Sequence, residues 1–171
     1  MVCDYCKKLE KYNFGDYIFN TKHWIIFLAP QQSNIGTCVV ALNRSAEDLS
    51  SLTSEEWTEF GELVGRLEFS VKQCFGVTMY NWGSLMNASY LEKPPNPHVH
   101  WHFIPRYNHE VEFDGLTFED PYFGNMKPRP FRALPDKIRS NIIEVIKTNL
   151  PDKTIRSINS NPSKTELKSD R

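Results

Sequence analysis

Three of the five histidines in this 171-residue chain stand two residues apart in one short stretch, HVHWHFIPRY, at His98, His100 and His102. Successive side chains of a β-strand point to opposite faces, so these imidazoles would share one face with Cα spacings of roughly 6.6 Å. Val99 and Trp101 would face the other way, into the core. A row of imidazoles on one face can surround a single anionic group or a single metal ion.

Such a row fits two kinds of chemistry. Neutral imidazoles can hold a metal ion together with a more distant ligand, and His109, Glu110 and Glu112 follow the run. Alternatively, one neutral imidazole can attack phosphorus and form a phosphoramidate, while its neighbours supply and collect protons. A pKa of about 6.5 suits imidazole to both roles near neutral pH. The residues alone leave both readings open.

The composition limits the class of protein. The chain is 40% apolar with a net charge of -1, which fits one compact domain and gives no basic field for nucleic acid or an anionic membrane. An anionic ligand would have to be held by local groups. No apolar run reaches the roughly 18 residues of a membrane span, and the start MVCDYCKKLE does not read as a signal peptide. Four cysteines are too few for a disulfide framework, so we expect a soluble, cytoplasmic protein.

Five stretches have the composition of β-strands. GDYIFNTKHWIIFLAP contains two of them around a turn at 20–22, and a third spans 37–42. VTMYNW and HVHWHFIP are the fourth and fifth, separated by the turn-rich loop GSLMNASYLEKPPNP. Strands followed by a helix and then by further strands indicate an α+β domain with an antiparallel sheet.

Two helices accompany these strands. LTSEEWTEFGELVGRLEFSVKQCFG predicts one long helix with a capping box at Thr53 and Glu56 and a stop at Gly76. A second helix begins near Pro135 and ends before Pro151. The polar remainder of the chain cannot repay the entropy of ordering, so we divide the chain into a domain at 1–150 and a tail at 151–171.

The segment FEDPYFGNMKPRPFRALP, which precedes the second helix, is aromatic and proline-rich. We expect it to pack back over the histidines or against a second subunit. Its acids Glu119 and Asp120 read as surface charges, and Arg106 reads either as an anion ligand or as a solvated side chain.

The stretch HVHWHFI resembles the motif of the histidine triad (HIT) superfamily, in which histidines alternate with hydrophobic residues. IGTCVVALNR is similar to that family's glycine-led strand, LTSEEWTEFGELVGRL to its long helix, YNWG to a strand end with a nucleotide-binding amide, and IPRY to a common sequel of the triad. The likeness covers 17–107. It implies a HIT-like fold and a homodimer that acts on purine nucleotide derivatives such as phosphoramidates or dinucleoside polyphosphates.

The resemblance also implies residue roles. His100 would be the nucleophile on the α-phosphate, forming a nucleotidyl-histidine that water later hydrolyses. His98 would orient it, His102 would contact phosphate or leaving group, and Asn81 would do the same from the preceding strand.

The chain departs from the family's pattern at two positions. Thr37 stands where many members have a fourth histidine, and Pro95 stands where others have a serine or threonine. Asn87, Ser89 or Asn96, in the loop before the triad, could supply the missing hydrogen-bond donor.

Apolar residues of the first strands line the nucleobase pocket in the family, which makes Ile18, Phe19 and Phe27 candidates here. Cys3 and Cys6 resemble a zinc-binding pair of some members, but ALNRSAE lacks the histidine that would complete the site, so we do not assign zinc. The covalent chemistry requires no cofactor, although a divalent metal ion can accompany a polyphosphate substrate. The alternatives are a metal-dependent enzyme with the three histidines as ligands and a non-catalytic nucleotide sensor on the same fold.

Overall fold

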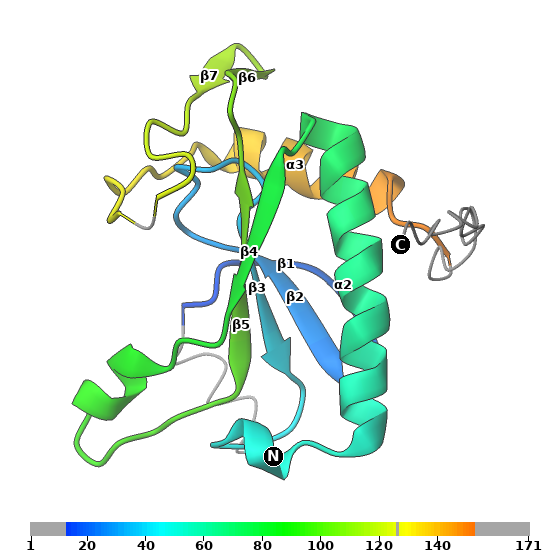
Figure 1. Cartoon of the computed structure of the whole chain (residues 1–171), viewed down its shortest axis with the longest axis vertical. Coiled ribbons are helices and arrows are strands. Elements are labelled where there is room, and N and C mark those ends of the chain that lie inside the picture. Colours follow the sequence, from blue (N-terminus) through cyan, green and yellow to red (C-terminus); the bar gives the residue numbers. More distant parts are fainter. Residues whose placement is uncertain (1–12, 126, 153–171) are drawn as a thin grey trace, which may run out of the picture.

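The computed structural model describes residues 13–125 and 127–152. Its main sheet contains β1 (Asp16–Asn20), β2 (Trp24–Leu28), β3 (Cys38–Leu42), β4 (Met79–Gly83) and β5 (His100–Arg106). The strands lie in the order β1-β2-β3-β5-β4 and all neighbours are antiparallel, which confirms the predicted α+β class (Figure 1). The histidine-bearing strand β5 therefore lies inside the sheet, and β4 forms one edge.

The start of β5 differs from the prediction by two residues. We expected the strand to begin at His98, but it begins at His100. The backbone of Val99 donates to the carbonyl of Ala46 at 2.9 Å and accepts from the amide of Leu42 at 3.0 Å. These bonds hold His98 against the end of β3 without regular strand pairing.

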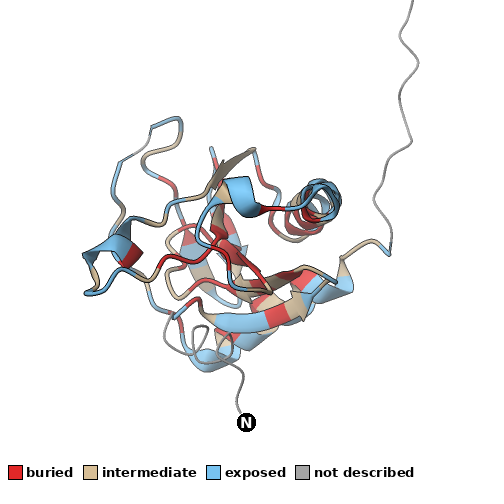
Figure 2. Cartoon of the chain, turned by 90° about the horizontal axis from the view of Figure 1, so that it is seen from below, coloured by how far each residue is buried: buried red, intermediate tan, exposed pale blue. Residues whose placement is uncertain are grey.

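Both predicted long helices are present on one face of the sheet. Helix α2 (Ser54–Phe75) begins at the capping box of Thr53 and ends at Gly76, whose φ of 67° favours glycine. Helix α3 (Asp136–Thr148) follows the proline-rich segment. The buried core joins both helices to the sheet; it includes Leu63, Leu67, Ile142 and Ile146 from the helices and Trp24, Ile26 and Phe103 from the strands (Figure 2).

The opposite face of the sheet carries the loops. The segments 84–97, 119–125 and 127–135 lie on the side of the sheet away from α2 (Figure 1). Two short 3-10 helices, η1 (Leu49–Ser51) and η2 (Asn87–Leu91), lie before α2 and within the first of these loops. This arrangement leaves the histidine face of β5 beneath loops instead of helices.

A hairpin of β6 (Val111–Phe113) and β7 (Leu116–Phe118) follows β5 and was not predicted. Its turn consists of Asp114 and Gly115, with φ values of 49° and 74°. Asp-Gly with positive φ at both positions is a favoured two-residue hairpin turn, so the signal was present in the sequence. Within the described residues, the helices are too short or too polar to cross a membrane. Cys3, Cys6 and the tail beyond Asp152 lie outside the part described.

Candidate active site

Alternation along β5 separates the histidines from the core, as predicted. Trp101 stacks on Phe60 of α2 with ring centroids 4.8 Å apart, and Phe103 is fully buried on the same side. The rings of His100 and His102 lie on the other face, with centroids 5.0 Å apart. His98 is on that side too, because the ring of Phe14 lies 5.1 Å from His100 and 6.3 Å from His98.

Hydrogen bonds fix the orientation of two imidazoles. Nδ1 of His100 lies 2.8 Å from the carbonyl oxygen of His98. A carbonyl oxygen only accepts, so Nδ1 carries the hydrogen and Nε2 keeps its lone pair. By the same reasoning, Nε2 of His98 donates to the carbonyl of Leu42 at 2.9 Å. His98, which is only 1% exposed, therefore fixes the orientation of the His100 ring through its backbone carbonyl.

The surroundings keep the imidazoles uncharged. Burial lowers the pKa of His100 from 6.5 to about 4, and the charges that His102 and His98 would carry lower it further, against the hydrogen bond to the His98 carbonyl. Burial also lowers the pKa of His102, against a hydrogen bond to the backbone of Leu85. Both rings are neutral at pH 7, the state in which imidazole is a nucleophile.

A cavity of about 410 Å³ opens onto His100 and His102. Pockets of this size hold small-molecule ligands. The loop before β5 forms one wall, with Leu85, Met86 and Ser89, and Asn34 and Thr37 before β3 form another. The hydroxyl of Ser84 donates to the carbonyl of His100 at 2.9 Å, which ties this loop to the central histidine.

Of the polar candidates near the cavity, the structure brings Thr37 and Ser89 to the lining but not Asn87, which is exposed. The Thr37 hydroxyl donates to the carbonyl of Asn34 at 2.6 Å, and the Ser89 hydroxyl donates to that of Met86 at 2.6 Å. A hydroxyl has one hydrogen to give, so in this arrangement both oxygens face a ligand as acceptors.

Asn81 lies on the histidine face of the edge strand β4, opposite Ile104, but does not line the cavity. In the amide orientation that satisfies its neighbours, its oxygen accepts from Nη1 of Arg106 at 3.2 Å and its nitrogen donates to the carbonyl of Tyr80 at 3.2 Å. Asn81 therefore contacts Arg106 and does not line the cavity that contains His100 and His102.

The two aromatic candidates lie elsewhere. Phe27 is on the cavity side of the sheet, but it packs against Phe14, with ring centroids 5.8 Å apart, and does not reach the lining. Phe19 packs against the core on the helix side. A register shift in β1 between Tyr17 and Phe19 lets both Ile18 and Phe19 turn toward that core.

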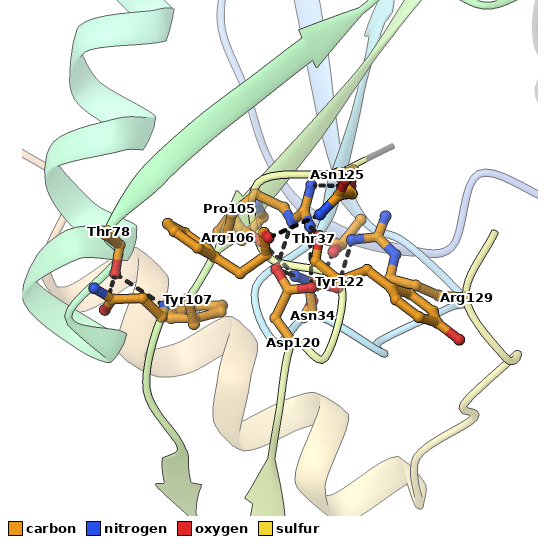
Figure 3. Close-up of polar contacts among 12 residues, drawn as sticks. Asn34, Thr37, Thr78, Pro105, Arg106, Tyr107, Asp120, Tyr122, Asn125 and Arg129 are labelled. Atoms are coloured by element: carbon orange, nitrogen blue, oxygen red, sulfur yellow. Dashed lines mark hydrogen bonds and ion pairs between the residues drawn. The ribbon is translucent and has the colours of Figure 1, made fainter. Parts of the chain in front are cut away.

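Arg106 and Asp120 form a buried ion pair, so Asp120 is not the surface charge we expected, and Arg106, expected to be either an anion ligand or solvated, binds a carboxylate of the chain itself. Arg106 is 2% exposed, and its Nε and Nη2 lie 2.5 and 3.1 Å from the two carboxylate oxygens (Figure 3). Burial tends to raise the pKa of Asp120, but hydrogen bonds from Arg106 and Asn34 outweigh it and lower the pKa. The pair is complete without a ligand.

Two lining residues, Arg129 and Phe131, were not predicted individually. Their segment was expected to pack over the histidines or against a second subunit, and these two residues line the cavity that also contains His100 and His102. Nη1 of Arg129 donates to the side-chain oxygen of Asn34 at 2.5 Å (Figure 3). Phe131 is 67% exposed at the mouth of the cavity. The aromatic and proline-rich composition of the segment was the only signal for either residue.

The described part of the chain holds no group of three His, Cys, Asp or Glu side chains with the geometry of a metal site. In the triad, Nε2 of His98 points at the carbonyl of Leu42.

Comparison with known proteins gives matches in structure only. No family model and no curated protein matches the sequence. A hypothetical histidine triad nucleotide-binding protein from Sulfolobus tokodaii superposes with a TM-score of 0.61 at 13% identity, over 86% of this chain and 91% of the other. A histidine triad protein from Bradyrhizobium japonicum gives 0.60 at 15% identity, over 84% and 94%. The diadenosine triphosphate hydrolase of Plasmodium falciparum gives 0.52 at 16% identity, over 85% and 92%.

Proposed function

This chain has the fold of the histidine triad proteins, and on that premise we propose that it is a nucleotide hydrolase or nucleotidyl transferase whose nucleophile is His100. The substrate is a purine nucleotide derivative with a leaving group on its α-phosphate. Two of the structural neighbours support a nucleotide ligand, since one is described as nucleotide-binding and another as a diadenosine triphosphate hydrolase.

The observation that carries the proposal is the hydrogen bond between Nδ1 of His100 and the carbonyl of His98. It leaves the lone pair on Nε2 of a ring that lines the cavity. Burial holds the pKa of this ring at about 4, so the nucleophile needs no deprotonation at neutral pH.

The reaction then has two displacements at phosphorus. In the first, Nε2 of His100 forms a bond to the α-phosphorus while the bond from phosphorus to the leaving group breaks, and the leaving group departs with the electron pair and takes up a proton from the solvent. In the second, water attacks phosphorus and gives up a proton to the solvent, the phosphorus–nitrogen bond breaks with its electron pair returning to Nε2, and the nucleoside monophosphate leaves. His102, 5.0 Å away between ring centroids, is placed to contact the phosphate or the leaving group.

The rest of the cavity suits a nucleoside. Val39 and Ile104 give it an apolar floor, and Phe14 and Phe131 add aromatic rings. The exposed ring of Phe131 at the mouth offers a face on which a base can stack. Phe131 therefore takes the role expected of Phe19.

The two alternatives differ from the proposal in measurable ways. A metal-dependent enzyme would need the three imidazoles to converge on one ion, whereas His98 is directed at a backbone carbonyl. A divalent ion that accompanies a polyphosphate substrate remains compatible with attack by His100. A non-catalytic sensor would bind nucleotide without forming a covalent intermediate.

The test is to trap the intermediate. Protein is mixed with diadenosine triphosphate or adenosine 5′-phosphoramidate labelled at the α-phosphate, quenched in base, and analysed for label that acid releases. We expect label on the wild type and on the control His109→Asn, which alters an exposed histidine outside the cavity, and none on His100→Asn. Turnover of His100→Asn should fall at least about a thousandfold.

Two results would contradict the proposal. Near-normal hydrolysis by His100→Asn would remove His100 from the chemistry. Nucleotide binding by the wild type, with neither label nor turnover on either substrate, would instead support the sensor.

We also infer a homodimer, as the sequence resemblance implies. The edge strand β4 is a surface on which a second copy could extend the sheet. Light scattering coupled to size-exclusion chromatography measures the mass directly, and a mass equal to the 19.9 kDa of one chain would refute the inference.

A further inference from the structure

The cavity has a second polar end, away from the histidines, and Arg129 provides its charge. The side chain is partly buried and comes from the segment between β7 and α3. The guanidinium donates a hydrogen bond to the side-chain oxygen of Asn34, a neutral amide. A charged guanidinium thus reaches the cavity supported by a group that does not neutralise it.

The charges around this end do not balance. Asp120 is engaged on both oxygens by Arg106, and Asn34 donates to it at 3.0 Å. Among the residues that the structure describes, no carboxylate forms an ion pair with Arg129. Glu119 lies nearby in a shallow outer hollow, but it is exposed. Arg106 therefore takes the one buried carboxylate in this cluster, and Arg129 lines the cavity without a carboxylate of its own.

An unbalanced cation in a partly desolvated site is costly until an anion joins it. The electrostatic cost also lowers the pKa of Arg129: burial lowers it most, the charge of Arg106 lowers it further, and the negative charge of Asp120 raises it in part. An anionic group of the ligand would relieve both causes.

The position of Arg129 separates this anion from the phosphorus that His100 attacks. Asn34, which binds Arg129, also donates to the carbonyl of Pro105 at 2.9 Å. Pro105 follows His102 by three residues and His100 by five, so its Cα lies roughly 10 to 17 Å from theirs along β5. The apolar lining residue Ile104 lies between His102 and Pro105 on β5. This spacing favours contact of one phosphate with the histidines and of a second anionic group with Arg129.

Resting on the proposed function, we propose that Arg129 binds a second phosphate of the substrate, remote from the one that reacts. Arg129 is thus a specificity-determining residue that selects nucleotides with two separated anionic groups. The second phosphate is attached either to the ribose or to the far end of a polyphosphate chain. In both cases a phosphate group contacts the guanidinium of Arg129.

Calorimetric titration distinguishes these sources. The probes are adenosine 5′-monophosphate, adenosine 3′,5′-bisphosphate and α,β-methylene adenosine triphosphate, whose bridge next to the α-phosphate resists hydrolysis. We expect one of the two multiply charged probes to bind the wild type about ten- to hundredfold more tightly than the monophosphate, the range of one charge-assisted contact. Arg129→Gln should lose this gain and keep its affinity for the monophosphate.

Arg132→Gln is the matched control, because Arg132 lies on the same segment but packs over Phe118, with its guanidinium 4.1 Å from the ring centroid, outside the cavity. It should behave as the wild type. Equal affinity for all three probes, or a gain that survives in Arg129→Gln, overturns the role of Arg129 while monophosphate binding and labelling of His100 still stand. Failure of every nucleotide to bind overturns the proposed function as well.

Discussion

The buried, uncharged state of His100 makes the stability of the protein depend on pH in a defined way. The pKa is about 4 in the folded chain, where burial opposes protonation, and 6.5 when the ring is exposed. The unfolded chain therefore binds a proton at His100 between these values and the folded chain does not. The contribution of His100 to the free energy of unfolding is fully present above pH 6.5 and decreases as the pH falls toward 4.

The size of the effect follows from the two values. At pH 5.0, His100 is about 97% protonated in the unfolded chain but about 9% protonated in the folded one, given pKa values of 6.5 and about 4. This difference lowers the free energy of unfolding by about 2 kcal/mol relative to pH 7.5. Lowering of the His102 pKa acts in the same direction.

Urea denaturation at pH 7.5 and pH 5.0 measures this loss for the wild type and for His100→Gln. The variant lacks the group, so it should lose about 2 kcal/mol less on acidification. Other groups cancel in the comparison; Glu56, whose pKa is lowered to about 2 chiefly by a hydrogen bond from Arg44, is common to both proteins. Titration of the histidine ring signals by NMR reports His100 directly.

Equal losses for the two proteins, together with an NMR midpoint for His100 near 6.5, would refute the reasoning. His100 would then be an ordinary exposed imidazole. Its protonation at mildly acidic pH would remove the nucleophile, and the structural basis for attack on phosphorus would be lost.

Two further changes test the packing that supports the site. Asp120→Asn leaves the guanidinium of Arg106 buried without its carboxylate and should lower the free energy of unfolding, measured in urea, by about 3–5 kcal/mol. The control Glu119→Gln changes the exposed neighbour and should have little effect. Equal losses of stability in the two variants would contradict the ion pair. Gly76→Ala should lower the melting temperature, because the φ of 67° at Gly76 disfavours alanine and lowers the free energy of unfolding by about 1 kcal/mol. Gly61→Ala lies inside α2, where the added Cβ meets no atom within 4 Å, and should raise the melting temperature. The opposite order would show that the helix does not end at Gly76.

The elements that the sequence predicted well are those set by neighbours in the chain. Helix α2 has both ends where expected, because the capping box of Thr53 and the left-handed conformation of Gly76 involve only a few adjacent residues. The separation of His100 and His102 from Trp101 likewise needs only the two-residue period of a strand.

The nucleobase candidates show where this period fails. The resemblance makes Ile18 and Phe19 candidates for the nucleobase pocket, but the register shift after Tyr17 lets both of these consecutive residues pack on the core side. Nothing in the run of apolar residues marks the position of such an irregularity. The pairing of β1 with β2 decides it.

Charge at the cavity is the property least accessible from the sequence. Arg106 and Asp120 meet only because the β6–β7 hairpin returns the chain to β5, and Arg129 meets Asn34 across 95 residues. The net charge of -1 is a sum over the whole chain and does not show which charges line the cavity. A ligand responds to the few charges that line its cavity, so the composition is informative only about broad anionic partners such as nucleic acid. It carries no information against a small anion held by one arginine.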